Sequence, residues 1–215
     1  RRHSFPTRRS SDLHTCADAA TAAGDQRAPF GGTVGESLPN WGPVAAAGGR
    51  TVTMTNLYTD PDSRARSKLQ ESAIFCAATD SQYPPLGEET VLDSLLHEAA
   101  HNLGPSHDYS VAGKTAPQAF GGPLASTLEE LKAQNSSLYL LSLLQSRGVL
   151  QEDEVLRTLR GGLAWAFGHI SRGMYTADGT PRNYSHVAAI QIGSYFDSGA
   201  LTWVAEPAAN GKDMG

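Results

Sequence analysis

Residues 87–101, GEETVLDSLLHEAAH, constrain the fold most, because helical periodicity and reactive side chains coincide there. Apolar residues recur at i, i+3 and i+4 spacing, which forms one apolar stripe on a helix of 3.6 residues per turn. The stripe consists of Leu92, Leu95, Leu96, Ala99, Ala100 and Leu103. We therefore expect a buried helix that begins near Glu88 and stops at Gly104 and Pro105.

The same helix would carry a metal-binding motif. His97 and His101 are four residues apart, so their imidazoles project from one face and both could reach an ion at a Zn–N distance of about 2.0–2.1 Å. Glu98 could take a proton from a water that the ion polarises. This is the HExxH arrangement of zinc hydrolases, and the alternative is a half-buried helix that bears these three residues by chance.

The third ligand decides the mechanism, because a hydrolytic zinc site needs three protein ligands and an open position. His107 completes HEAAHNLGPSH, which fits the HExxHxxGxxH pattern of metzincin endopeptidases, with Met174 as the candidate methionine turn. Glu130, in STLEELKA, would instead give a His, His, Glu set. Of the adjacent pair Glu129 and Glu130, one could bind the metal while the other orients a histidine ring, although both also fit capping boxes.

The rest of the chain predicts a mainly α fold with little strand. Helical spacing indicates four further helices, at residues 64–78, 124–146, 151–171 and 185–196. Residues 50–58 favour a strand or extended arm, residues 60–63 a turn, and residues 105–123 a long loop. Residues 14–40 carry no clear period and are expected to be irregular, with one short helix near residues 17–23.

Composition excludes several classes of protein. A chain of 215 residues with 40% hydrophobic content can bury a core, and it has no run of 18 uncharged apolar residues that would span a membrane. Residues 1–13, RRHSFPTRRSSDL, resemble one reading frame of a sequencing adapter, so we treat them as a non-native, disordered tail. The tail holds four arginines and one aspartate, so the remainder carries a net charge of −8 rather than −5. This acidic body argues against nucleic acid as a partner.

Four segments in this order resemble the catalytic region of the dipeptidyl peptidase III family of zinc exopeptidases. They are GESLPNWGPVAAAGG, HEAAH, LEELKAQNSSLYL and YSHVAAIQIGSYFDSGAL, and together they cover nearly all of residues 30–205. The resemblance implies a mainly helical, zinc-bearing domain that faces a second domain across a cleft. Residues 14–215 would then be a helical catalytic domain, as a fragment of a larger two-domain protein.

The resemblance also implies roles for single residues. Zinc would be bound by His97, His101 and Glu130, and Glu98 would be the general base. Glu129 would orient a ligand histidine without binding the metal itself. Asn40 would fall where the family binds the substrate backbone, and His186 where it places a histidine that steadies the transition state.

Three features depart from the family pattern. HEAAH has one residue fewer between its histidines than the better-known members, the loop to EELKA is short, and Ile190 stands where an arginine is expected. The sequence therefore predicts a zinc-dependent peptidase that acts on peptide substrates and releases N-terminal dipeptides. The alternatives are a metzincin-type endopeptidase with His107 as third ligand, and a non-catalytic, metal-stabilised helical module.

Overall fold

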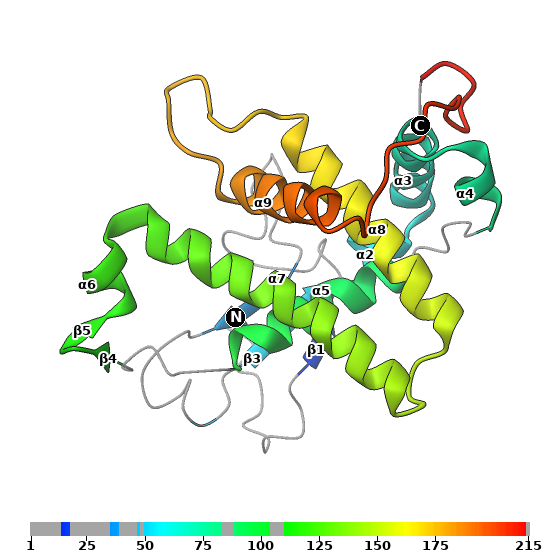
Figure 1. The fold of residues 1–215 in the computed structure, drawn as a ribbon. Helices are drawn as coiled ribbons and strands as arrows, with labels where there is room; N and C mark the ends of the chain where they lie inside the picture. The colour runs from blue at the N-terminus through cyan, green and yellow to red at the C-terminus, as the bar shows by residue number, and fades with distance from the viewer. Residues whose placement is uncertain are drawn as a thin grey trace, which may run out of the picture.

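The computed structural model describes residues 14–17, 35–38, 47, 50–82, 88–103 and 110–213. Helices dominate this part of the chain (Figure 1), which confirms the prediction of a mainly α fold. The helices are α2 (Asn56–Thr59), α3 (Pro61–Ile74), α4 (Ala77–Gln82), α5 (Glu88–His101), α6 (Ala116–Phe120), α7 (Gly122–Ser146), α8 (Glu152–Ile170) and α9 (Asn183–Asp197). The strands are β1 (His14–Ala17), β2 (Gly35–Leu38), β3 (Arg50–Met54), β4 (Ser110–Val111) and β5 (Lys114–Thr115).

Four helices form the core. The long α7 packs against α5 on one side and α9 on another, and α8 contacts both α5 and α9 (Figure 1). Alanines lie fully buried where these helices meet, at Ala100 of α5, Ala133 of α7 and Ala188 of α9. Such small side chains allow the helix axes to approach closely, so polar groups on α5 and α7 can meet directly.

A small sheet covers α5. Its central strand β3 pairs with β1 in parallel and with β2 in antiparallel orientation, and α5 contacts both β2 and β3. The expectation that residues 14–40 are irregular is therefore wrong for 14–17 and 35–38. These strands depend on backbone hydrogen bonds to β3, which a four-residue segment does not reveal through its own periodicity. The short helix expected near residues 17–23 lies outside the described residues, apart from Ala17 at the end of β1.

The predicted helix at residues 64–78 begins earlier and is interrupted. Asp60 caps α3 by accepting hydrogen bonds from the backbone N–H of Asp62 and Ser63, and Pro61 occupies the first turn. The predicted turn at residues 60–63 is thus a helix start. Phe75 is extended and ends α3, and the next residue, Cys76, forms an isolated bridge with Ala208.

The later helices are confirmed within a few residues. Gly148, with a φ of 71°, follows the end of α7, and a capping box of Gln151 and Glu154 begins α8. Within the predicted loop at 105–123, residues 110–115 form a hairpin and α6 follows. Ala112 and Gly113 both have positive φ, which is the geometry of a tight hairpin turn. Leu103 lies exposed beyond the end of α5 rather than in its buried stripe.

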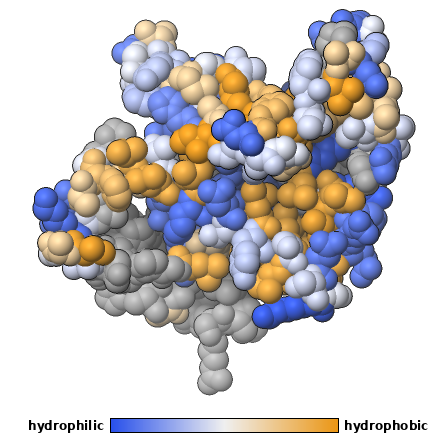
Figure 2. Space-filling model, viewed as in Figure 1, coloured by the Kyte–Doolittle hydropathy of each residue, from blue (hydrophilic) through white to orange (hydrophobic). Residues whose placement is uncertain are grey.

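The surface carries apolar side chains as well as charges (Figure 2). Val111 of β4, Phe120 of α6 and Leu124 near the start of α7 are among the exposed apolar residues. Over the residues that the structure describes, no helix combines the length and the hydropathy needed to cross a bilayer.

Candidate metal centre

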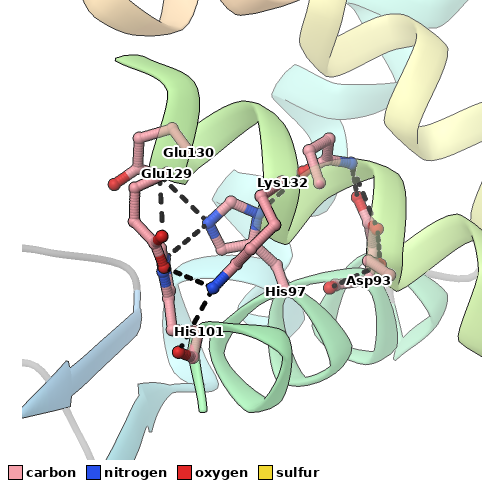
Figure 3. A network of polar contacts seen from close by, with 8 residues as sticks. Asp93, His97, His101, Glu129, Glu130 and Lys132 are labelled. Atoms are coloured by element: carbon pink, nitrogen blue, oxygen red, sulfur yellow. Dashed lines mark hydrogen bonds and ion pairs between the residues drawn. The ribbon is translucent and has the colours of Figure 1, made fainter. Parts of the chain in front are cut away.

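Two helices supply the polar side chains of the predicted site (Figure 3). His97 and His101 project from α5, and Glu129 and Glu130 from the facing α7. The histidines lie one helical turn apart, which brings their ring centroids to 4.9 Å, and the two rings meet nearly at right angles. The structure thus brings together four of the residues that the sequence singled out.

Three ligand atoms converge on one point. Nε2 of His97 lies 3.2 Å from Nε2 of His101, and Oε2 of Glu130 lies 3.2 Å and 3.8 Å from these two nitrogens. An ion held about 2.0–2.1 Å from each of three tetrahedral ligands would separate the ligand atoms by about 3.3 Å. The triangle therefore fits a metal of this kind. Both histidine side chains are 11% exposed and Glu130 is 19% exposed, so the convergence is largely shielded from solvent.

Glu98 lies beside this triangle. Its carboxylate, His97 and His101 form a group whose possible ligand atoms all lie within 4.8 Å of one another. Oε2 of Glu130 lies 3.2 Å and 3.8 Å from the two ring nitrogens, which makes Glu130 a candidate third ligand. The role predicted for Glu98, to take a proton from a metal-bound water, stays a prediction.

Each ring is also held from behind. Nδ1 of His101 lies 3.1 Å from Oε1 of Glu129, which accepts a 2.6 Å hydrogen bond from Nζ of Lys132. Nδ1 of His97 lies 2.9 Å from Oε1 of Gln134. Metal-binding histidines commonly donate their second N–H in this way, which fixes the ring and its tautomer. Gln134 stands one turn after Glu130 on α7, and no sequence pattern pointed to it.

The charges of the site are coupled. Burial alone would lower the pKa of His97, but the hydrogen bond and charge of Glu130 outweigh burial and raise it. Burial alone would raise the pKa of Glu130, but the contact with His97 lowers it. For Glu129, burial is likewise overcome by His101 and Lys132, which lower the pKa to about 2. Both glutamates are therefore ionised at neutral pH, as metal binding requires.

Two tyrosines that the sequence did not indicate adjoin the cluster. Burial, with the charges of Glu130 and Glu98, raises the pKa of Tyr184, whose hydroxyl hydrogen-bonds to Glu130. Burial also raises the pKa of Tyr58 to about 12, and the Tyr58 hydroxyl lies 2.5 Å from Oγ of Ser94. Both phenols stay protonated at neutral pH and can donate hydrogen bonds.

The other predicted site residues are less defined. His186 lies in the first turn of α9, with its ring edge-on to Tyr175 at 5.4 Å, and no contact found among the described residues joins it to the metal ligands. Asn40 and His107 lie outside the described residues, so their predicted roles stay predictions.

Fold and site together define a helical protein that presents HExxH on one helix and a carboxylate on the facing helix. Two solved structures have this fold: the structure of DPP III from Caldithrix abyssi, and that of dipeptidyl-peptidase III from Corallococcus sp. strain EGB. The first gives a TM-score of 0.65 at 20% identity and covers 80% of this chain and 32% of that chain. The second gives 0.61 at 25% identity, with 84% and 33% covered.

The resemblance to the dipeptidyl peptidase III family is thereby confirmed at the level of the fold. This chain spans about a third of the length of these two structures. No protein-family model matches the sequence, and no curated protein matches it significantly. The metzincin and structural-module alternatives are not favoured by these findings.

Proposed function

We propose that this chain is the catalytic region of a zinc-dependent peptidase that releases dipeptides from the N-termini of peptides. The observation that carries the proposal is the triangle formed by Nε2 of His97, Nε2 of His101 and Oε2 of Glu130, with edges of 3.2, 3.2 and 3.8 Å. The likeness to dipeptidyl peptidase III structures supports the substrate class.

In this proposal His97, His101 and Glu130 hold the zinc, which supplies Lewis acidity toward the scissile carbonyl and toward a bound water. Glu98 takes the proton of that water and later delivers it to the leaving amine. Glu129 and Gln134 keep the two rings oriented from behind. Tyr184 donates to Glu130 and steadies that carboxylate. His186 and Asn40 would contact the substrate, as the family resemblance implies.

The domain arrangement is part of the same proposal. Residues 14–215 would form the zinc-bearing domain of a larger two-domain protein, with the substrate cleft completed by the other domain. The lengths of the two similar structures, about three times that of this chain, support this arrangement. Activity of the isolated chain is accordingly expected to be lower than that of its parent.

The test combines metal content with turnover. Purified chain and full-length parent are assayed side by side for zinc stoichiometry and for hydrolysis of dipeptidyl-arylamides, with a long internally quenched peptide as endopeptidase substrate. We expect one zinc per chain and release of dipeptides by the parent. Glu98→Gln should retain the zinc and abolish turnover, because it removes only the proton acceptor. A stoichiometric zinc site without activity in either protein would favour the metal-stabilised module.

A second pair of variants separates the two candidate third ligands. Glu130→Ala should lose zinc, whereas His107→Ala should retain it. If Glu130→Ala kept both zinc and activity while His107→Ala lost them, and the long peptide were cut internally, the metzincin mechanism would replace the one proposed.

A further inference from the structure

A line of polar contacts continues behind His97 and returns to its own helix. Oε1 of Gln134 lies 2.9 Å from Nδ1 of His97, and Nε2 of Gln134 lies 3.4 Å from each carboxylate oxygen of Asp93. Ser137 completes the arrangement with a 2.8 Å hydrogen bond to Oδ1 of Asp93. Gln134 is 6% exposed and Ser137 is fully buried, so water does not compete freely for these contacts.

The contacts have a direction. A carboxylate accepts hydrogen bonds, so the side chain of Gln134 must turn its NH2 group toward Asp93 and its carbonyl oxygen toward His97. A carbonyl oxygen only accepts, so Nδ1 of His97 has to carry the proton. Nε2, which faces His101 and Glu130, is then the nitrogen left to bind a metal in place of its hydrogen bond to Glu130.

We propose that Asp93 is a positioning residue, which sets the tautomer of His97 through the amide of Gln134. The inference rests on the proposed zinc site and adds to it a residue that touches neither metal nor substrate. Without an acceptor at position 93, the amide of Gln134 could rotate and present its NH2 group to Nδ1. The proton would then move to Nε2, and that nitrogen would no longer be available to a metal.

Hydrogen bonds at Asp93 also keep the carboxylate itself in place. The pKa of Asp93 is raised because burial outweighs the hydrogen bonds from Ser137 and Gln134, which favour the charged form. The two ligand histidines are thus supported differently. His101 faces a carboxylate directly, whereas His97 faces an amide that a carboxylate orients.

The decisive variant exchanges the two functional groups. Asp93→Asn combined with Gln134→Glu places a carboxylate next to Nδ1 of His97 and an amide donor at position 93. Nδ1 of His97 therefore still faces a hydrogen-bond acceptor and keeps its proton. Gln134→Glu alone places two buried carboxylates side by side, and Asp93→Ala removes the orienting acceptor. Asp80→Asn serves as control, because Asp80 is a partly buried acid that binds Arg160 in another part of the structure.

We measure the zinc dissociation constant by competition with a chromophoric chelator, and the fold by circular dichroism. Loss of such an outer contact typically weakens metal binding by about 10–100-fold, which we expect for Asp93→Ala and Gln134→Glu. The double exchange should return to within about threefold of the wild type, and Asp80→Asn should bind zinc normally. Wild-type affinity in Asp93→Ala, or a double exchange no better than Gln134→Glu alone, would overturn the proposal.

A spectroscopic comparison reads the tautomer directly. Glu130 and Gln134 compete for the proton of the neutral His97 ring when no metal is bound. ¹⁵N spectra of histidine-labelled, metal-free protein at alkaline pH should therefore show a larger share of His97 protonated at Nδ1 in the wild type than in Asp93→Ala, or than in Asp93→Leu if Asp93→Ala does not fold, with the signal assigned by its loss in His97→Gln. An equal or larger share in the variant would refute the inference. Absence of zinc binding by the wild type would instead refute the proposed function, and the tautomer would still be decided by the metal-free spectra.

Discussion

Replacing each of the adjacent glutamates on α7 with glutamine distinguishes a metal ligand from a residue that orients one. Oε2 of Glu130 lies at one corner of the triangle, whereas Oε1 of Glu129 lies 3.1 Å from the rear nitrogen of His101. The two substitutions remove the same charge from neighbouring positions, so a difference between them reports on role rather than on local charge.

The magnitude for Glu129 follows from its surroundings. Lowering a pKa from 4.5 to about 2 corresponds to about 3 kcal/mol in favour of the ionised form. This interaction is shared between His101 and Lys132, and the Glu129 side chain is 30% exposed, so solvent screening reduces the part available to His101 to roughly 1–2 kcal/mol. We therefore expect Glu129→Gln to weaken zinc binding by roughly 5- to 30-fold.

Glu130→Gln should weaken zinc binding more than Glu129→Gln does, because a charged metal ligand is lost. The expected loss exceeds roughly 100-fold, which is the upper range for residues that only orient a ligand. Both dissociation constants can be measured by chelator competition at one pH, with Glu154→Gln as a control that removes a helix-cap carboxylate from α8. If Glu129→Gln proved as damaging as Glu130→Gln, or more so, the assignment of the third ligand to Glu130 would be wrong.

Three further outcomes are expected. Tyr184→Phe should weaken zinc binding by about 10- to 150-fold, since a hydrogen bond to a charged acceptor contributes about 1.5–3 kcal/mol. Tyr139→Phe, on the exposed side of α7, should leave zinc binding unchanged, and equal affinities of the two variants would contradict the contact of Tyr184 with Glu130. Burial, with a smaller effect of Arg172, lowers the pKa of His169 to about 4. Between about pH 6.5 and pH 4, His169 is therefore protonated in the unfolded chain but neutral in the folded chain. Stability should therefore fall as pH drops through this window, and urea unfolding of His169→Phe should show a smaller fall; an unchanged pH dependence would exclude His169 as a cause. Leu141→Ala should cost about 2–5 kcal/mol in urea unfolding because Leu141 is 1% exposed, and Leu69→Ala, at a residue 72% exposed, should change little. Similar losses of unfolding free energy in the two variants would mean that Leu141 does not lie in the core.

The long helices could be predicted because their signals are local. Apolar spacing marks α5, α7, α8 and α9, and caps such as the Gln151 and Glu154 pair mark their ends. Features that depend on distant partners were missed. β1 and β2 exist by pairing with β3, and the break after α3 lies where Cys76 pairs with Ala208. Leu69 fits a helical stripe but lies on the exposed side of α3, because the stripe does not say which face a neighbour covers.

The candidate site divides in the same way. HExxH spacing predicts that His97 and His101 share a face, and the family resemblance indicates Glu130 as their partner. Neither indicates Asp93 or Gln134, because the pairing of their side chains is decided by how two helices pack. A glutamine or an aspartate on a half-buried helix has many possible partners, so its type alone carries little information.

The contacts between α5 and α7 make the site depend on helix register. Along α5 the order is Asp93, His97, His101, and their partners on α7 are Ser137 and Gln134, then Glu130, then Glu129. Rising numbers on one helix meet falling numbers on the other, so the two helices run antiparallel. A slide of one turn, about 5.4 Å, would offer Gln134 rather than Glu130 to the metal side of His97. Packing at the fully buried Ala100 and Ala133 therefore matters to the chemistry as well as to stability, because larger side chains there would force the helices apart or out of register.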